Sequence, residues 1–588
     1  MSQKHLMSGN EAIARGAWEA GCSFGSGYPG TPSSEILPVL TKLGGAYTEW
    51  APNEKGALEA VAGASLTGAR CICTMKHVGL NVAADPFFTL SYTGVNGGIM
   101  IISADDPEMH SSQNEQDNRN YARAAKVPML EPSTAQEALE FTKLAFELSE
   151  RHDTPVMLRV TTRLCHSDGV VETGEREGGA DACAPEKQSG KYVMIPGRAR
   201  ARRIVIAERT RALREWGETA TVNRIERGDK SIGIISSGIA YEYAKEVMPE
   251  ASFLKLGLTW PLPEKLIRDF AASVDKVYVI EELDLFLTEQ VRGLGVTVEA
   301  LPEELQLGEL SPLRVAEALT PSPSPMPPQT AAGRGESEGE PLPARPPQLC
   351  AGCPHRGPFH ILRKLRLFVT GDIGCYTLGT LPPLQALDTC LCMGAGIGMA
   401  HGINQACGEK QKAVAVIGDS TFMHSGITGL LNIAYNQSPT VVMILDNSIT
   451  AMTGGQNHPG TGVKMNGQPG GTADLEAICR ACGIPNVRRF DPRNLEQTEE
   501  VIRTAVDSDE PWVIIATHPC VLITRERGDV YMIDNETCIQ CGACLRIGCP
   551  AIAATVREDG KRQPVIDASL CTGCSLCAQV CPKAAIRQ

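Results

Sequence analysis

The sequence predicts an α/β protein made of doubly wound, parallel-sheet domains, with a small cysteine-rich domain at its C-terminal end. Short apolar runs alternate with helical stretches over most of the chain, which is typical of βαβ units. The segment 321–348 is dominated by Pro, Gly, Ser and Glu, and it predicts an exposed linker between two folded halves. An ordered, proline-rich arm over a surface is the alternative for this segment. From Val530 onward cysteine becomes dense, which indicates a separate metal-dependent module.

The composition limits the class of protein. With 588 residues, of which 43% are hydrophobic, the chain can form about three to five domains with sizeable cores. The 68 acidic residues exceed the 55 basic ones and give a formal charge of −13, which argues against nucleic acid as the main partner. The polar N-terminus shows no signal peptide and no apolar run suits a transmembrane helix, so we expect a cytoplasmic protein without a membrane partner. In that reducing compartment, 22 cysteines indicate metal or redox chemistry rather than disulfides.

Residues 1–170 are predicted to form the first α/β domain. The apolar runs Gly97–Ser103 and Pro155–Val160 are typical of buried strands, and Ala57–Thr67 and Ala135–Leu148 have the apolar spacing of helices. Strands that alternate with helices at this spacing predict a parallel sheet.

A second α/β domain is predicted over 231–320. Its strands are Ser231–Ser236 and Lys276–Ile280, and the helix Gly238–Val247 lies between them. The segment 171–230, charged and helical in part, is expected to connect the first two domains.

A third α/β domain is predicted over 349–528, and the cysteine-rich domain over 529–588. The buried strands of the third domain are Lys412–Ile417, Thr440–Leu445 and Pro511–Ala516.

The tail contains two similar cysteine runs, each a C-x₂-C-x₂-C sequence followed by a Cys-Pro pair. This is the pattern of bacterial ferredoxins with two [4Fe–4S] clusters, in which the fourth thiolate of each run binds the other cluster. We therefore expect one cluster on Cys538, Cys541, Cys544 and Cys581, and the other on Cys571, Cys574, Cys577 and Cys549. The first run has one residue more than usual before Cys549, which loosens the loop and keeps the ligand. Two structural zinc sites are the alternative, but they would leave the Cys-Pro pairs unexplained.

Two strands of the third domain end in polar loops. Gly418-Asp419-Ser420 ends one predicted strand, and Asp446-Asn447-Ser448-Ile449 ends the next. The pair resembles the GDG…NN motif of thiamine diphosphate enzymes. Ser420 stands in place of the last Gly of the motif, and Asp446 in place of its first Asn. Asp419, Asn447 and the carbonyl of Ile449 would bind Mg²⁺, which prefers hard oxygen ligands. The Gly-rich turn at Thr453 and Gly454 can offer N–H groups to a diphosphate.

Together with the ferredoxin pattern, these motifs make the chain resemble the 2-oxoacid:ferredoxin oxidoreductases, and among them the α subunits of the indolepyruvate enzymes. The resemblance covers nearly the whole chain. It is carried by Tyr28–Ser34, Glu49–Glu54, Leu349–Arg356, Gly371–Gly379, Asp388–Met393, the glycine-rich stretch Gly394–Gly402 and Thr453–Gln456.

The resemblance implies roles for domains and residues. The first domain would bind the pyrimidine of thiamine diphosphate, the third its diphosphate, and the second would resemble the transketolase C-terminal domain. Glu54 would hydrogen-bond the aminopyrimidine, Thr31 would contact the substrate carboxylate, and His77 would orient the substrate. The alternatives are a helix-start residue for Glu54, a turn residue for Thr31 and a packed residue for His77.

The resemblance also suggests a third [4Fe–4S] cluster near the cofactor, on Cys350, Cys353, Cys375 and Cys520. Only Cys350 and Cys353 have ligand-like spacing, so Cys375 and Cys520 could instead be small buried residues. Cys392, next to the glycine-rich stretch that begins at Gly394, is expected to pack near the cofactor.

The activity implied by the resemblance is the oxidative decarboxylation of an aryl 2-oxoacid such as indolepyruvate. Coenzyme A would take the acyl group, CO₂ would leave, and a ferredoxin would accept the electrons. A separate β subunit is implied, because the chain lacks a counterpart of one family domain. Three alternatives stay open: the same chemistry on pyruvate or 2-oxoglutarate, a non-oxidative decarboxylase, and an electron-transfer subunit without a catalytic site.

Overall fold

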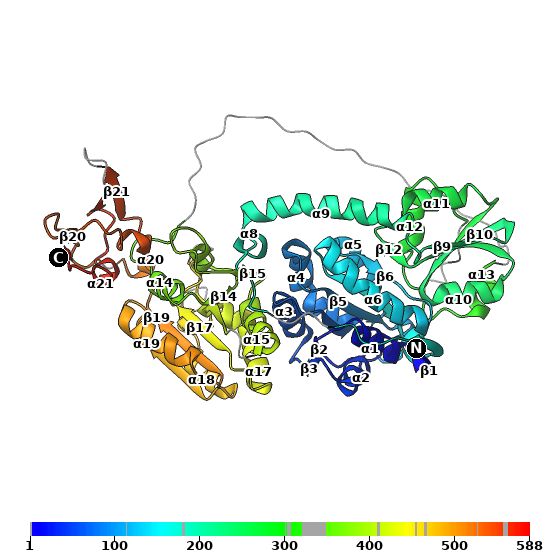
Figure 1. The fold of residues 1–588 in the computed structure, drawn as a ribbon, viewed down its shortest axis with the longest axis horizontal. Helices are drawn as coiled ribbons and strands as arrows, with labels where there is room; N and C mark the ends of the chain where they lie inside the picture. Colours follow the sequence, from blue (N-terminus) through cyan, green and yellow to red (C-terminus); the bar gives the residue numbers. More distant parts are fainter. Residues whose placement is uncertain are drawn as a thin grey trace.

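Three α/β units and a small C-terminal unit lie in a row in the computed structural model of the chain (Figure 1). The structure describes residues 3–112, 114–178, 183–299, 302, 307–319, 348–408, 412–452, 455–463, 467–525, 527–556 and 562–588. The predicted linker, 321–348, lies outside these residues except for Gln348. Within the described part of the chain, no helix has the length and apolarity needed to cross a bilayer.

The first unit is built on a seven-stranded sheet in the order β12-β6-β7-β5-β4-β2-β3. All neighbours are parallel except β12, which runs antiparallel to β6. Its strands are β2 (Phe24–Gly27), β3 (Tyr47–Trp50), β4 (Cys71–Lys76), β5 (Ile99–Asp105), β6 (Met129–Leu130), β7 (Val156–Thr161) and β12 (Leu258–Trp260). The helices are α1 (Gly9–Glu19), α2 (Ile36–Leu43), α3 (Glu54–Ser65), α4 (His77–Thr93), α5 (Arg119–Ala125), α6 (Ala135–His152) and α7 (Thr162–His166).

Local sequence explains where these helices begin. Ser8 and Glu11 form a reciprocal capping box at α1, and the Thr134 side chain accepts from the Glu137 N–H at α6. The Asn53 side chain accepts from the Gly56 N–H, 2.9 Å away, and so caps α3 one residue before Glu54.

Three predicted boundaries need correction. The boundary at 231 falls inside β10 (Asp229–Ser237), and β9 (Arg224–Glu226), which lies in the predicted connecting segment, pairs with β11 (Ala251–Leu256) of the second unit. The boundary at residue 170 falls inside β8 (Asp168–Thr173), which pairs with β1 (Gln3–Ser8), so the first unit continues past it. The strand β12 comes from the second predicted domain and extends the sheet of the first. Sequence patterns do not show which sheet a strand of three residues will join, because its pairing depends on tertiary contacts with strands that are distant in sequence.

The second unit has a four-stranded sheet in the order β13-β10-β11-β9. Its strands are β9 (Arg224–Glu226), β10 (Asp229–Ser237), β11 (Ala251–Leu256) and β13 (Val277–Ile280), and its helices are α10 (Gly238–Val247), α11 (Glu264–Ala271), α12 (Phe286–Gly293) and α13 (Pro312–Leu319). The predicted connecting segment contains α8 (Ser189–Tyr192) and the long helix α9 (Pro196–Gly217), which runs along the first unit (Figure 1).

The third unit has a fully parallel six-stranded sheet in the order β15-β14-β16-β17-β19-β18. Its strands are β14 (Phe368–Gly371), β15 (Thr389–Cys390), β16 (Ala413–Gly418), β17 (Val441–Asp446), β18 (Asn486–Phe490) and β19 (Trp512–Thr517). The helices are α14 (Arg356–Lys364), α15 (Ala395–Cys407), α16 (Asp419–Thr421), α17 (Ile427–Tyr435), α18 (Leu475–Ala481), α19 (Leu495–Val506) and α20 (Val521–Thr524).

The C-terminal unit consists of two small antiparallel strand pairs and short helical turns. β20 (Met532–Ile533) pairs with β23 (Ile586–Arg587), β21 (Ile552–Val556) pairs with β22 (Arg562–Ile566), and α21 (Leu576–Gln579) lies in the second cysteine run. In the longer first run, Gly548 precedes Cys549 and has a φ of 71°, a conformation that favours glycine.

The first and third units meet where α3 packs against α15. A Cβ at Gly63 would lie 2.1 Å from the Met399 carbonyl oxygen, and one at Gly402 would lie 1.9 Å from that of Ala60. Glycine at both positions therefore lets the two backbones touch. This contact holds the middle of α3 against the third unit.

Candidate active site

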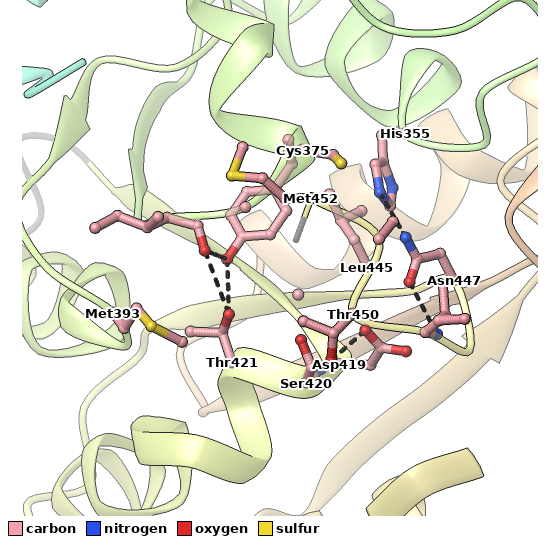
Figure 2. A pocket seen from close by; sticks show the side chains of 16 residues that line it. His355, Cys375, Met393, Asp419, Ser420, Thr421, Leu445, Asn447, Thr450 and Met452 are labelled. Carbon is pink, nitrogen blue, oxygen red and sulfur yellow. Dashed lines mark hydrogen bonds between the residues drawn. The ribbon is translucent and has the colours of Figure 1, made fainter. Parts of the chain in front are cut away.

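The two polar loops predicted from the sequence line one cavity in the third unit (Figure 2). Gly418, Asp419 and Ser420 lie where β16 ends, and Asn447 and Ile449 lie just after β17. Because β16 and β17 are parallel neighbours, their carboxyl ends meet at one edge of the sheet, where α/β proteins bind ligands. The cavity holds about 530 Å³ of free space, part of it open to solvent.

Asp419 and Asn447 provide the oxygen atoms that a hard cation requires. Asp419 is buried; its Oδ1 accepts from the Ser420 N–H at 2.8 Å, and its Oδ2 lies 3.1 Å from His458 Nε2. Asn447 Oδ1 accepts from the Ile449 N–H at 3.3 Å. A carboxylate oxygen and an amide oxygen on neighbouring loops fit a Mg²⁺ ion that bridges to a diphosphate. Thr453 and Gly454 lie outside the described residues.

A buried carboxyl group holds the glycine turn at the other side of the cavity. Asp372 Oδ2 accepts from the Gly394 N–H at 3.0 Å, and Asp372 Oδ1 accepts from the Tyr376 hydroxyl. Burial raises the pKa of Asp372 to about 8. Gly394 has a φ of 89°, and a Cβ there would lie 2.2 Å from Ser425 Oγ, so the turn requires glycine.

His355, which was assigned no role from the sequence, is part of the cavity wall. Its Nε2 lies 3.4 Å from Asn447 Nδ2, and its ring lies edge-on to Tyr376 with 6.2 Å between the centroids. Burial lowers the pKa of His355 to about 4, so the imidazole is neutral and Nε2 can accept from the amide. The only sequence signal was its place two residues after Cys353, in a motif that the family resemblance singled out.

Glu54 begins α3 at the side of the first unit that faces the third. A Cβ at Gly79 would lie 2.5 Å from Glu54 Oε1, so this glycine makes room for the carboxyl group. Burial raises the pKa of Glu54, which increases the protonated fraction near neutral pH. Its neighbour Lys55 reaches across the interface, and Lys55 Nζ donates to the carbonyl oxygen of Met393, a cavity residue, at 3.0 Å.

Thr31 and His77 are not among the described residues that line this cavity. Thr31 is exposed in the loop after β2, and His77 begins α4 after β4, so both lie at the carboxyl edge of the first sheet. His77 Nε2 lies 3.2 Å from Asn114 Oδ1, and its buried Nδ1 has no hydrogen-bond partner among the described residues. Burial lowers the pKa of His77.

The tail brings its eight cysteines together in the two predicted sets. Cys538, Cys541, Cys544 and Cys581 line one cavity. In the other set, burial raises the pKa of Cys577 to about 12, and the nearby thiols of Cys574, Cys549 and Cys571 raise it further. Two groups of four thiols are the arrangement that two cubane clusters require.

The four cysteines suggested for a third cluster also converge. Burial raises the pKa of Cys375, and the thiols of Cys520 and Cys350 act on it in the same direction. Burial raises the pKa of Cys353 to about 12, with additional contributions from Cys350 and Cys375. Cys375 also lines the cavity that holds Asp419 and Asn447. Cys392 is buried at the contact of the first and third units, where its Sγ lies 3.3 Å from Lys55 Nζ.

Three family models match the chain. The model of the pyruvate flavodoxin/ferredoxin oxidoreductase, thiamine diphosphate-binding domain, matches residues 15–232. The C-terminal TPP-binding domain of thiamine pyrophosphate enzymes matches 372–516, and a 4Fe–4S dicluster domain matches 531–587. The predicted fold class, with thiamine diphosphate-binding α/β domains and a C-terminal iron–sulfur domain, is therefore confirmed.

Curated relatives match over nearly the whole chain. Indolepyruvate oxidoreductase subunit IorA of Methanothermobacter marburgensis is 42% identical over 99% of this chain and 97% of that protein. Subunit IorA of Archaeoglobus fulgidus is 40% identical over 100% of this chain and 97% of that protein. The 2-oxoglutarate synthase subunit KorA of Methanothermobacter thermautotrophicus is 27% identical over 52% of this chain and 95% of that protein.

Solved structures show a weaker likeness. The 2-oxoglutarate:ferredoxin oxidoreductase from Magnetococcus marinus aligns with 53% of this chain and 64% of that chain, at 17% identity and a TM-score of 0.46.

Proposed function

Because the chain belongs to the family of indolepyruvate oxidoreductase IorA subunits, and thus to the 2-oxoacid:ferredoxin oxidoreductases, we propose that it is the catalytic subunit of an enzyme that oxidises aryl 2-oxoacids. The substrate would be indolepyruvate or a related acid, and the products an aryl acyl-CoA and CO₂. The runner-up is the same chemistry on a smaller 2-oxoacid, which the KorA relatives keep open.

One observation carries the proposal: a single cavity connects three kinds of chemical group. Asp419 and Asn447 lie in one part of it, Met393 beside Lys55 in another, and Cys375 in its wall. Such a cavity suits an extended cofactor with a diphosphate at one end and an aminopyrimidine at the other. When bound, thiamine diphosphate supplies the electron sink for decarboxylation.

The residues of the chain would divide the work. Asp419, Asn447 and Ile449 would hold Mg²⁺, and the turn at Gly418 and Ser420 would accommodate the diphosphate. Glu54, with its raised pKa, would donate a hydrogen bond to a ring nitrogen of the aminopyrimidine and so favour the imino form, whose exocyclic nitrogen can accept a proton. Thr31 and His77 would contact the substrate at the same edge of the first sheet.

The packing of the tail supports an order for the electron path. Cys549 and Cys574 pack against the core of the third unit together with Cys353, whereas Cys544, Cys577 and Cys581 contribute to a separate small core in the tail. Arg356 Nη1 donates to the carbonyl oxygens of Ile547, at 3.1 Å, and Gly548. The set with Cys549 would therefore hold the cluster nearest to the third unit, and the set with Cys541, an exposed residue, would hold the cluster nearest to an external electron acceptor.

The partners follow from this reaction. A ferredoxin would accept the electrons, coenzyme A would take the acyl group, and a β subunit would complete the family's domain set. We propose the cytoplasm as the compartment, because thiols that bind clusters must stay reduced. The division into pyrimidine-binding, transketolase-like and diphosphate-binding domains is part of the same proposal.

The test is anaerobic reduction of a viologen dye by the purified complex with coenzyme A and a panel of 2-oxoacids. We expect reduction with indolepyruvate and phenylpyruvate at a higher kcat/KM than with pyruvate or 2-oxoglutarate. A preference for pyruvate would contradict the aryl specificity, but it would still support the oxidation of 2-oxoacids. No reduction with any 2-oxoacid, in a preparation with full cofactor and iron content, would contradict the catalytic role.

A further inference from the structure

Lys55, which follows Glu54 in the first turn of α3, makes the most direct polar contact between the first unit and the cavity. Its Nζ donates to the Met393 carbonyl oxygen at 3.0 Å and lies 2.5 Å from Glu59 Oε1 on its own helix. The ammonium is mostly buried, with 13% of the Lys55 side chain exposed. The buried ion pair with Glu59 raises the pKa of Lys55, so the ammonium stays charged.

The peptide group between Met393 and Gly394 is held from three sides. Its oxygen accepts from Lys55 Nζ and from Ser425 Oγ, the latter at 2.8 Å, and its N–H donates to Asp372 Oδ2. Ser425 and Asp372 belong to the third unit, so Lys55 provides the one bond to this peptide that comes from the first unit among the described residues. The peptide is part of the cavity wall through Met393.

The contact between Lys55 and Met393 also restricts the position of the Glu54 carboxyl group relative to the cavity. Glu54 and Lys55 are consecutive residues in one helical turn, so a bond that fixes the Lys55 ammonium also limits how far the start of α3 can move. The tight α3–α15 contacts, Gly402 against Ala60 and Gly63 against Met399, lie about one and a half to two turns after Lys55. Without Lys55, the first turn of α3 would be the least constrained part of this interface, because helix ends fray.

We propose that Lys55 is a positioning residue that keeps Glu54 in register with the cofactor cavity by anchoring α3 to the Met393–Gly394 peptide. The inference rests on the proposed role of Glu54. The competing explanation is that Lys55 only forms a structural ion pair with Glu59. In that case the contact with Met393 would have no effect on the position of Glu54.

The experiment uses the full chain in its anaerobic complex, loaded with thiamine diphosphate and Mg²⁺. It measures the rate at which the C2 proton of the bound cofactor exchanges with deuterium, by rapid quench and NMR. Cofactor affinity by calorimetry and the melting temperature are measured on the same preparations. The C2 exchange rate reports the proton transfer that Glu54 supports and does not depend on substrate binding or on electron transfer.

We expect Lys55→Met to slow C2 exchange by roughly ten- to a hundredfold, because a small displacement of a catalytic group has effects of this size. Cofactor affinity should stay within about threefold of wild type, because the Mg²⁺ and diphosphate contacts are intact. Lys55→Arg should recover most of the exchange rate, since it can donate to the same carbonyl. Ser425→Ala, which removes the other donor to this oxygen, should slow exchange much less because it leaves the link between the units.

The double variant Lys55→Met/Glu59→Gln separates the two explanations, since it leaves no unpaired buried carboxylate. Slow exchange in both Lys55→Met and the double variant supports the positioning role. Full recovery in the double variant, or an unchanged rate in Lys55→Met, overturns it. Glu54→Gln is run alongside: normal exchange in that variant would overturn the role of Glu54 itself. If Lys55→Met does not fold, the double variant and Lys55→Arg decide by the same criteria.

Discussion

Asp419 is the residue on which cofactor binding should depend most, because its carboxylate is the charged ligand in the proposed Mg²⁺ set. We expect Asp419→Ala to abolish Mg²⁺-dependent binding of thiamine diphosphate, measured by calorimetry. Asp507→Ala, at an exposed position after α19, is the control and should bind the cofactor normally. Wild-type affinity in Asp419→Ala would remove this residue from the metal site.

At the scale of single residues, the sequence predicted the groups that stand in recognisable motifs. Asp419, Asn447 and the ferredoxin cysteines have fixed spacing, so their neighbourhood in space followed from the chain. His355 and Tyr376 line the cavity, Asp372 accepts from the Tyr376 hydroxyl, and His458 lies beside Asp419, and these contacts depend on how three separate segments pack. A lone histidine or a buried aspartate has no periodic signal, so the sequence could not assign these four.

At the scale of elements, the α3–α15 contact makes a specific prediction about glycine. We expect Gly63→Ala to lower the melting temperature, because a Cβ 2.1 Å from the Met399 carbonyl oxygen forces the helices apart, at a cost of about 1–3 kcal/mol. It should also weaken cofactor-dependent activity, because Glu54 moves with α3. Differential scanning calorimetry and the viologen assay measure the two effects.

Gly56→Ala is the matched control for that substitution, since it lies in the same helix. The nearest atom to its Cβ would be Asn53 Oδ1 at 3.4 Å, an ordinary contact. Alanine should stabilise the helix there by up to about 1 kcal/mol. Equal effects of the two substitutions would show that the close approach of the helices does not limit stability.

The contact of the first and second units predicts a pH dependence. Five buried carboxyl groups surround two buried guanidinium groups there: Asp105, Asp117, Glu131, Glu281 and Glu282 around Arg119 and Arg159. Burial raises the pKa of Glu282 from its ordinary 4.5 to about 7. The protonated form is favoured in the folded chain, so its stabilising contribution is complete below pH 4.5 and is lost as the pH rises through 7.

Glu282→Gln should therefore raise the melting temperature at pH 8 more than at pH 5. Glutamine keeps the bond from the Leu310 N–H, which Glu282 Oε1 accepts at 3.0 Å, and never acquires the buried charge. Glu289→Gln, on α12 in the same unit, is the control. The same shift at both pH values would contradict a role for Glu282 ionisation.

At the scale of the whole molecule, the sequence predicted the α/β units and the tail because each has its own hydrophobic pattern or cysteine spacing. It placed the strands of the third unit within one or two residues of β16, β17 and β19. It did not predict that β12 would join the first sheet or that the tail would dock through Arg356, because both depend on contacts between distant segments. The glycines of α15 were recognised in the sequence as a motif. The need for glycine becomes clear only in the structure, where α3 packs against them.

The count of iron atoms in the whole chain tests the third cluster. If the tail alone binds clusters, the chain carries two and about eight irons; with Cys350, Cys353, Cys375 and Cys520 it carries three and about twelve. The physical reason to expect the third is distance. Cys375 lines the cofactor cavity, whereas the tail meets the third unit at Gly352 and Arg356, so a cluster between them shortens the first electron step.

Substitution in the full chain is the better test than removal of the tail, because the tail covers part of the third unit. We expect Cys350→Ala/Cys353→Ala to lose about four irons per chain, with the ferredoxin-type signals intact on reduction, and to reduce viologen slowly. Cys479→Ala/Cys482→Ala is the matched control: it has the same C-x₂-C spacing in the same unit, on and just after α18. It should keep all its iron. Equal iron in the two variants, or about eight irons in the wild-type chain, would leave the tail as the sole iron–sulfur module, and electrons would then have to cross the third unit in one step.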